Sequence, residues 1–202
     1  KIMAPSTQFD VVVVGAGAVG LAIANKLQTK GLRTVAIERN QRSGMETSSR
    51  SSEVIHAGFY YPKNSLKQTL CVRGRELLYS FLSEHSVRYR KTGKIVVACN
   101  ESERATLHSL CEKAMNLGVP VRSLSYNDIK KIEPEVHALE GFLSSETGIF
   151  DTEEYVVALE RSFTDKGGIV VFGARVEDWS FEQNEYCVSI IQGAECYDLS
   201  AR

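Results

Sequence analysis

The chain has 202 residues, of which 43% are hydrophobic and 24% are charged, and its formal net charge is −1. This composition is typical of a globular protein with one large domain or two small ones, and it excludes a global charge that would attract nucleic acid or an acidic membrane. No apolar run approaches the roughly 20 residues that a membrane span needs, and no targeting signal is visible. Five scattered cysteines and four histidines without ligand spacing predict reduced, mostly buried thiols and no metal site.

Residues 9–38 have the pattern of a βαβ unit. Val11–Val14 is an unbroken apolar run, which suits a strand buried on both faces of a parallel sheet. An amphipathic helix follows and closes at Gly31, and a second apolar run, Val35–Ile37, ends on Glu38. The apolar positions of the expected helix are Val19, Ala22, Ile23 and Leu27.

Three glycines between the first strand and the helix have G-x-G-x-x-G spacing. Gly15 allows a sharp turn, Gly17 allows a pyrophosphate to approach the backbone, and Gly20 allows the helix to pack close to the strand. The helix N-terminus offers N–H groups and partial positive charge to the phosphates. Glu38, at the tip of the second strand, is placed to accept hydrogen bonds from a ribose diol. The complete unit therefore predicts dinucleotide binding.

The next stretch is polar and then aromatic. Residues 39–52 form a loop of small polar residues, which is either a ligand-holding loop after a strand tip or a solvated loop. Residues 53–62 read EVIHAGFYYP, and Ser65 with Gln68 then opens a helix that fades near His85. Mid-helix Gly74 suggests a close approach, and Arg75 is expected to be solvated. The expected buried stripe consists of Leu66, Leu70, Leu77, Leu78, Phe81 and Leu82.

The remaining chain alternates helices and strands. Strands are expected at 87–89, 94–98, 119–124 and 139–144, with helices from Asn100 to Gly118, from Ser125 to before Pro134, and from Asp151 to Gly167. Four strands at meander spacing follow, at 169–172, 175–181, 186–191 and 196–199. The fold class is therefore α/β, with a Rossmann-like unit and parallel sheet interleaved with a mixed α+β part. The expected domains are 9–86 for dinucleotide binding, 87–172 for the substrate, and 173–202 as a return to the first.

The sequence closely resembles the flavin-dependent L-2-hydroxyglutarate dehydrogenases, within the D-amino-acid-oxidase-like group. The resemblance runs from about Phe9 to about Val176 and is strongest in the first hundred residues. Family members are much longer, so the resemblance implies an N-terminal fragment. The residues that carry it are Gly15, Gly17, Gly20, Glu38, Ser48–Arg50, Val54–Gly58, Tyr60–Pro62, Leu70–Cys71, Gly74–Leu78, Lys91–Ala98, Thr147–Ile149 and Asp151.

This resemblance implies an enzyme that oxidises L-2-hydroxyglutarate, a 2-hydroxy acid, to 2-oxoglutarate by hydride transfer to FAD. His56 would lie by the flavin and act as the catalytic base, or only position the ring. Tyr60 and Tyr61 would face the substrate pocket or belong to the core. The FAD-binding residues would be Gly15, Ala16, Gly17, Ala18, Gly20, Glu38, Arg39, Ser48, Ser49, Arg50 and Val176.

Other readings stay open. The same fold acts on amino acids or glycerol phosphate in related enzymes, and a non-catalytic dinucleotide-binding fragment is a further alternative. The serine- and arginine-rich loop followed by VIHAG speaks against an NAD-dependent dehydrogenase. The resemblance also implies a quinone or another electron carrier as acceptor. It implies a mitochondrial location for a eukaryotic source, and a cytoplasmic or membrane-associated one for a bacterial source.

Overall fold

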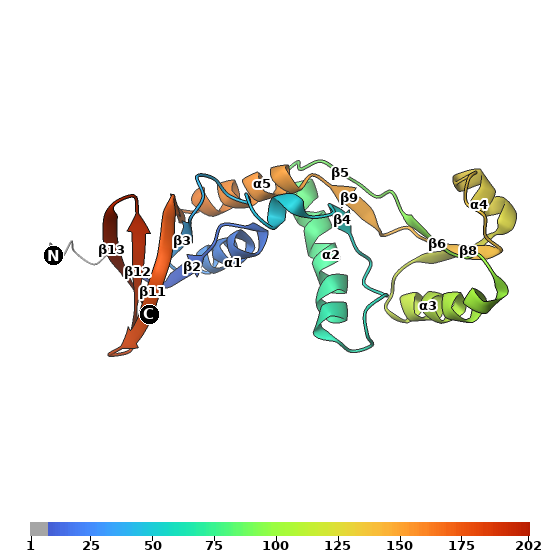
Figure 1. The fold of residues 1–202 in the computed structure, drawn as a ribbon, viewed down its shortest axis with the longest axis horizontal. Helices are drawn as coiled ribbons and strands as arrows, with labels where there is room; N and C mark the ends of the chain where they lie inside the picture. The colour runs from blue at the N-terminus through green and yellow to red at the C-terminus, as the bar shows by residue number, and fades with distance from the viewer. Residues whose placement is uncertain (1–7) are drawn as a thin grey trace. The chain divides into compact units, whose positions relative to one another are not determined.

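The computed structural model describes residues 8–202 and divides into two compact units (Figure 1). Of the described residues, unit 1 comprises 8–51 together with Thr152–Arg202, and unit 2 comprises Ser52–Asp151. These boundaries differ from the expected ones at 86/87 and 172/173. The interleaving itself is present, because unit 2 is inserted between two segments of unit 1.

Unit 1 contains a three-stranded parallel sheet in the order β10-β3-β2. Its strands are β2 (Val11–Val14), β3 (Thr34–Glu38) and β10 (Ile169–Phe172). Helix α1 (Ala18–Thr29) connects β2 to β3, and α5 (Thr152–Thr164) precedes β10. All five residues of β3 are buried, as its apolar run predicts for a central strand. The α/β class with a Rossmann-like parallel sheet is thus confirmed.

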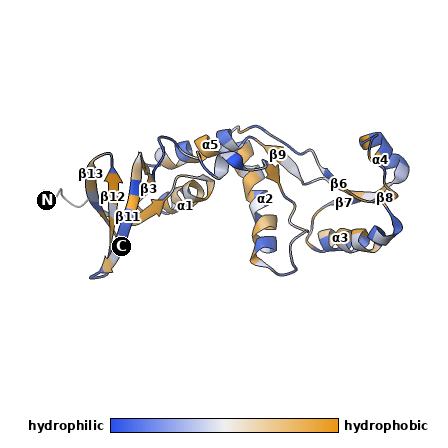
Figure 2. Cartoon of the chain, viewed as in Figure 1, coloured by the Kyte–Doolittle hydropathy of each residue, from blue (hydrophilic) through white to orange (hydrophobic). Residues whose placement is uncertain are grey.

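The expectation that β2 is buried on both faces is wrong. β2 lies at the edge of the sheet and pairs only with β3 among the described strands (orange strand beside α1 in Figure 2). Val14 is 66% exposed, and Val19 and Ile23 on α1 are also exposed. The buried residues of α1 are instead Leu21 and Ala24, and the side chain of Asn25 reaches Ser162 on α5. Of the four apolar positions expected to face the core, Val19 and Ile23 are therefore exposed, and Ala22 and Leu27 are only half-buried.

A second sheet of unit 1 is an antiparallel meander. Strands β11 (Ala174–Glu182), β12 (Glu185–Gln192) and β13 (Glu195–Ala201) pair in sequence, and β1 (Gln8–Phe9) joins β13 in parallel. β10 was expected at the start of this meander, but it pairs with β3, because the chain crosses back through α5. The core that joins the two sheets consists of Phe9, Val35, Ile37, Ala174, Val188 and Ile190.

Unit 2 is built from two antiparallel sheets and three helices. The first sheet has the order β4-β9-β5, with β4 at Val54–Ile55, β9 at Gly148–Phe150 and β5 at Tyr89–Arg90. The second has the order β6-β8-β7. Its strands and the helices of the unit are β6 (Lys94–Ala98), β7 (Val121–Ser125), β8 (Glu140–Ser144), α2 (Leu66–Glu84), α3 (Arg104–Asn116) and α4 (Tyr126–Ile132).

Helix α2 presents a different face to the core from the one expected. Ser65 caps it as predicted, accepting a hydrogen bond from the Gln68 N–H at 3.2 Å. Leu82 is buried, but most of the predicted leucine stripe is not: Leu66, Leu70 and Leu77 are exposed. The buried positions are Gln68, Arg75, Tyr79 and Leu82. Arg75, expected to be solvated, is only 6% exposed, and a Cβ on Gly74 would meet open space rather than a close neighbour.

Within residues 8–202 no disulfide joins any of the five cysteines, and three of them, Cys99, Cys187 and Cys196, are exposed. The expectation of mostly buried thiols is therefore wrong, because Cys187 and Cys196 belong to the solvated faces of β12 and β13. Within residues 8–202, no helix is both long and apolar enough to cross a membrane.

Candidate functional site

The turn after β2 requires glycine at two positions. Gly15 has φ of +97°, a conformation that side chains disfavour, and its N–H donates to the Ile37 carbonyl at 2.8 Å. A Cβ on Gly20 would lie 2.0 Å from the Gly15 carbonyl oxygen. Glycine at position 20 therefore lets α1 pack directly against the turn, as the spacing predicts.

The N-terminus of α1 is open to an anion. Gly17 is its N-cap residue and has no side chain that could cap the helix. The first turn carries no acidic residue. The Ala18 N–H donates to Ser48 Oγ at 3.0 Å, and a Cβ on Gly17 would lie 3.1 Å from the same oxygen. The loop after β3 thus meets the helix N-terminus through Ser48. Partial positive charge and bare backbone at this point suit a phosphate group.

Glu38 holds the strand tip and the glycine turn together. Its Oε2 accepts a hydrogen bond from the Ala16 N–H at 2.9 Å, and its Oε1 accepts from both the backbone N–H and the side-chain amide of Asn40 at 2.8 Å. The residue is 7% exposed. A carboxylate has about four lone-pair positions, so one remains on Oε2 for a hydroxyl donor.

Arg39 is engaged by a neighbouring carboxylate. Its Nε and Nη2 donate to the two oxygens of Glu46 at 2.8 and 2.6 Å. These hydrogen bonds, together with one from the Asn40 amide, lower the pKa of the Glu46 carboxyl. The same pair raises the pKa of Arg39. Both side chains are largely exposed, so the pair orders the loop without contributing much stability.

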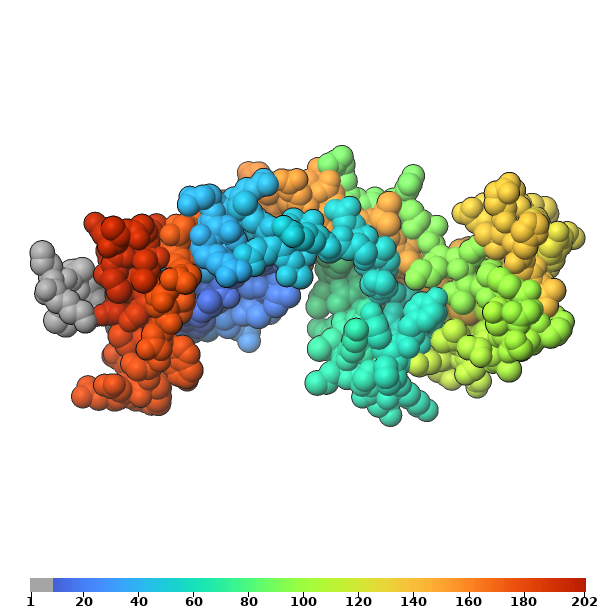
Figure 3. All heavy atoms as spheres, in the orientation of Figure 1, coloured from blue at the N-terminus to red at the C-terminus, as the bar shows by residue number. Residues whose placement is uncertain are grey.

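A cavity of about 370 Å³ lies where the turn, the tip of β3, the following loop and the start of β11 meet. In Figure 3 the loop, in light blue, lies against the orange part of the chain that begins β11. Six residues expected at the site line this cavity: Gly15, Gly17, Glu38, Arg39, Ser48 and Val176.

The other expected cofactor residues of unit 1 are not in the cavity lining. Ala16 is fully buried and serves through its N–H, and Gly20 packs against Gly15. Ala18 is bound to Ser48, as described above. Ser49 donates to the Glu46 carbonyl, and exposed Arg50 ends a short 3₁₀ helix at Ser48–Arg50.

Sequence reasoning missed several lining residues, namely Asn40, Gly44, Met45, Glu46, Thr47, Ala174 and Arg175. The residues of this set that belong to the loop lie in the polar stretch 39–52. The sequence of that stretch does not distinguish the residues that line the cavity from their neighbours. Gly44 (φ +73°) donates its N–H to the Ala16 carbonyl at 3.0 Å and so folds the loop onto the turn. A glycine in a polar loop after a strand tip was the available signal.

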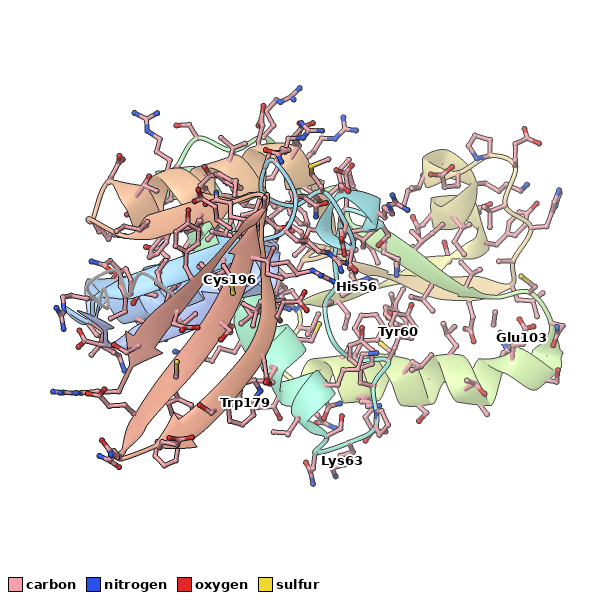
Figure 4. All side chains as sticks on the ribbon, turned by 60° about the vertical axis from the view of Figure 1, so that its left-hand side comes forward. His56, Tyr60, Lys63, Glu103, Trp179 and Cys196 are labelled. Carbon is pink, nitrogen blue, oxygen red and sulfur yellow. The ribbon has the colours of Figure 1, made fainter. Side chains whose placement is uncertain are left out.

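The expected catalytic and substrate residues lie in unit 2, on the segment between β4 and α2 (Figure 4). His56 is exposed, and Cys71 Sγ donates to its carbonyl at 3.5 Å. Partial burial lowers the pKa of His56, and the positive charges of Lys94 and Lys67 lower it further. Both effects favour the neutral imidazole, which is the form that can accept a proton.

Tyr60 and Tyr61 follow on the same segment. Tyr60 is 45% exposed, and partial burial raises its pKa. The centre of its ring lies 4.4 Å from the centre of the Phe59 ring. Tyr61 is half-buried, and its carbonyl accepts from Gln68 Nε2 and from Lys113 Nζ. Neither tyrosine is a fully buried core residue.

The sequence model of one protein family, described as FAD dependent oxidoreductase, matches residues 10–198. The chain belongs to this family. The match spans both the cavity of unit 1 and the His56 segment of unit 2. The cofactor of the family is FAD, and the residues of the cavity fit it: Gly17 places no side chain at the turn, and α1 presents its N-terminus.

Two individual relatives show which members of the family this chain is similar to. The chain is 43% identical over 160 residues to an L-2-hydroxyglutarate dehydrogenase, mitochondrial, of Arabidopsis thaliana, covering 76% of this chain and 32% of that protein. It is 35% identical over 177 residues to the Homo sapiens enzyme of the same name, covering 86% and 38%. The chain thus spans less than half the length of these relatives.

A solved structure with the same fold is the dithionite-reduced L-alpha-glycerophosphate oxidase from Mycoplasma pneumoniae with FAD bound. It superposes with a TM-score of 0.86 at 22% identity, covering 95% of this chain and 52% of that one. The likeness confirms the fold expected from the flavoprotein resemblance.

Proposed function

We propose that the protein containing this chain oxidises L-2-hydroxyglutarate to 2-oxoglutarate with FAD as cofactor. The observation that carries the proposal is the 43% identity to the plant L-2-hydroxyglutarate dehydrogenase over 160 residues. The family match, which includes both the glycine turn and His56, supports the redox chemistry.

The cavity of unit 1 takes the ADP part of FAD. The N-terminus of α1 would hold the pyrophosphate, with Gly17 placing no side chain there and Ser48 offering a hydroxyl. The remaining lone pair on Glu38 Oε2 would accept a hydrogen bond from a ribose hydroxyl. Val176 would line the adenine side of the cavity. Arg39 is held by Glu46, so it covers this cavity as part of an ion pair rather than as a free cation.

FAD, when bound, accepts the hydride from C2 of the substrate. The chain must remove the hydroxyl proton, and His56 takes it on an imidazole nitrogen. Its lowered pKa suits this role, because a neutral imidazole is already present near neutral pH. Tyr60 and Tyr61 border the same segment and contact the substrate.

Flavin reduction tests the proposal. Anaerobic addition of L-2-hydroxyglutarate to the FAD-loaded chain should bleach the visible flavin absorption. His56→Asn should slow this reduction much more than it weakens FAD binding, whereas His137→Asn, in the loop before β8, should leave both unchanged. Equal losses of FAD binding and of flavin reduction in His56→Asn would mean that His56 has only a structural role.

A non-catalytic dinucleotide-binding module is the second candidate function. It rests on the cavity of unit 1, whose lining residues belong to the dinucleotide-binding unit and do not include His56. A chain that retains FAD but is reduced by no 2-hydroxy acid would support it. Amino acids and glycerol phosphate are tested in the same spectrum, because the glycerophosphate oxidase shares only the fold at 22% identity.

The proposal extends to the electron acceptor and the location. A quinone or another carrier would accept the electrons that FAD takes from the substrate. The enzyme is mitochondrial if its source is eukaryotic, as the names of the plant and human relatives suggest, and cytoplasmic or membrane-associated if it is bacterial.

A further inference from the structure

Two lysines approach the aromatic segment that follows His56. Lys94 Nζ, from β6, lies 5.0 Å from the centre of the Tyr60 ring, and Lys67 Nζ, from α2, lies 4.5 Å from that of Tyr61. Among residues 8–202, no ion pair joins either lysine to a carboxylate. A ring face attracts an ammonium but carries no net charge, so both positive charges remain unneutralised.

A third cation lies on the same helix as Lys67. Arg75 is only 6% exposed, and its Nε and Nη1 have no hydrogen-bond partner among the described residues. The nearest carboxylate, on Glu76, is 3.7 Å from Nη2 and is itself largely exposed. A buried guanidinium with unmet donors is costly unless an anion compensates it. This part of unit 2 therefore has an excess of positive charge.

The nearby positive charges help to lower the pKa of His56. Lys94 on β6 and Lys67 on α2 both act on its imidazole, and Cys71 on α2 contacts its backbone carbonyl. Tyr60, on the segment of His56 itself, is held in its neutral phenol form because partial burial raises its pKa. No carboxylate is among the groups that shift the pKa of His56. Lys67 lies one helical turn from Cys71 on α2, so the Cys71 contact places His56 beside the part of α2 that carries Lys67.

We infer that His56, Lys67 and Lys94 form a binding site for one carboxylate of a dicarboxylic 2-hydroxy acid. The inference rests on the proposed function for the identity of the substrate. The two ammonium groups supply the charge that a carboxylate requires, and the tyrosine rings beneath them fix their positions. Arg75 adds background positive charge from within the unit.

This arrangement couples substrate binding to the strength of the base. In the free protein the lysines disfavour a proton on His56. A carboxylate bound between them offsets that repulsion, so the affinity of His56 for a proton rises when the substrate arrives. The imidazole becomes a better acceptor for the hydroxyl proton only in the complex.

The test is an NMR titration of the 202-residue chain without flavin. The chain has four histidines, and His56→Asn identifies the His56 C2–H signal. Its titration midpoint is measured in chloride, in L-2-hydroxyglutarate and in L-lactate at equal ionic strength. L-2-hydroxyglutarate should move the midpoint to higher pH and saturate, and the monocarboxylate should have a weaker effect. A midpoint that the dicarboxylate leaves unmoved would overturn the inference.

Substitutions of single lysines locate the site. Lys94→Gln and Lys67→Gln should each weaken L-2-hydroxyglutarate binding about fivefold, as expected for loss of one partly exposed ion pair. Lys130→Gln is the matched control, because Lys130 lies 6.0 Å from the centre of the Tyr126 ring on α4 and does not act on His56. Equal binding by wild type and Lys94→Gln would contradict the site.

The two proposals fail separately. A His56 signal that responds to L-2-hydroxyglutarate in a protein whose flavin the compound does not reduce would support the anion site and overturn the proposed function. Reduction of the flavin with the same substrate dependence in wild type, Lys67→Gln and Lys94→Gln would support the function and overturn the site.

Discussion

The Glu38 carboxylate accepts a hydrogen bond from the Ala16 N–H at 2.9 Å, although the two residues are 22 positions apart. This bond ties the tip of β3 to the glycine turn after β2. The same carboxylate also receives two hydrogen bonds from Asn40, which begins the loop over the cavity. Glu38 therefore shapes the site before any ligand binds.

Replacing Glu38 with Gln should lower the free energy of unfolding by about 2 kcal/mol, because the new amide hydrogens face N–H donors that a carboxylate satisfied. Chemical denaturation measures this change. Glu46→Gln, on an exposed side chain, should cost no more than about 0.5 kcal/mol. Similar losses for both variants would mean that the Glu38 network is not a structural element.

Alanine substitution should have opposite effects on stability at two helical glycines. Gly20→Ala places a Cβ 2.0 Å from the Gly15 carbonyl and should destabilise the protein by about 3 kcal/mol or more. Gly74→Ala meets open space within α2 and should stabilise it by about 0.5 to 1 kcal/mol. Thermal unfolding of the two variants side by side checks this, and a tolerated alanine at position 20 would contradict the packing described here.

Gly17→Val should separate cofactor binding from folding. The backbone at Gly17 has φ of −78° and ψ of 177°, which any residue adopts, and the added Cβ would meet only Ser48 Oγ, at 3.1 Å. The fold should therefore persist while FAD binding weakens by more than about tenfold, or about 1.4 kcal/mol. Flavin fluorescence quenching and circular dichroism measure the two effects. Undiminished FAD binding would remove the cofactor from this cavity.

His56 should make stability pH-dependent. Burial and the nearby lysines lower its pKa in the folded chain below the ordinary value of about 6.5. Between the two pKa values the unfolded chain binds more protons, so the free energy of unfolding decreases as pH falls through this window. Melting temperatures at pH 7.5 and 5.5 should differ more for wild type than for His56→Gln. An equal difference would show that His56 titrates normally.

The sequence predicts the βαβ unit well because its signals are local. The run at β3 is both apolar and buried, and Gly15 and Gly20 have the conformation and contacts that their spacing requires. The meander was also found, apart from the assignment of β10. A strand's partner depends on the path of the whole chain, which local spacing does not reveal.

Burial on α2 could not be read from hydropathy. Gln68 is buried because its amide accepts from Asn64 N–H and donates to the Tyr61 carbonyl, so its polar atoms are satisfied locally. Leu66 and Leu70 are exposed on another face of the same helix. An apolar stripe predicts a core face only when polar residues have no such partners.

The candidate site was predicted in part. Six of the expected residues line one cavity, since glycine spacing and a strand-tip acid report on backbone geometry. Lys67 and Lys94, for which we propose a role in carboxylate binding, have no sequence spacing in common with His56 that could have singled them out.

The visible absorption spectrum of the purified chain supplied with FAD, before and after anaerobic addition of L-2-hydroxyglutarate, tests the central claim most directly. We expect a bound flavin spectrum that bleaches with this substrate. A bound flavin that stays oxidised would contradict the proposed reaction, and a chain that retains no flavin would contradict the assignment of the cavity.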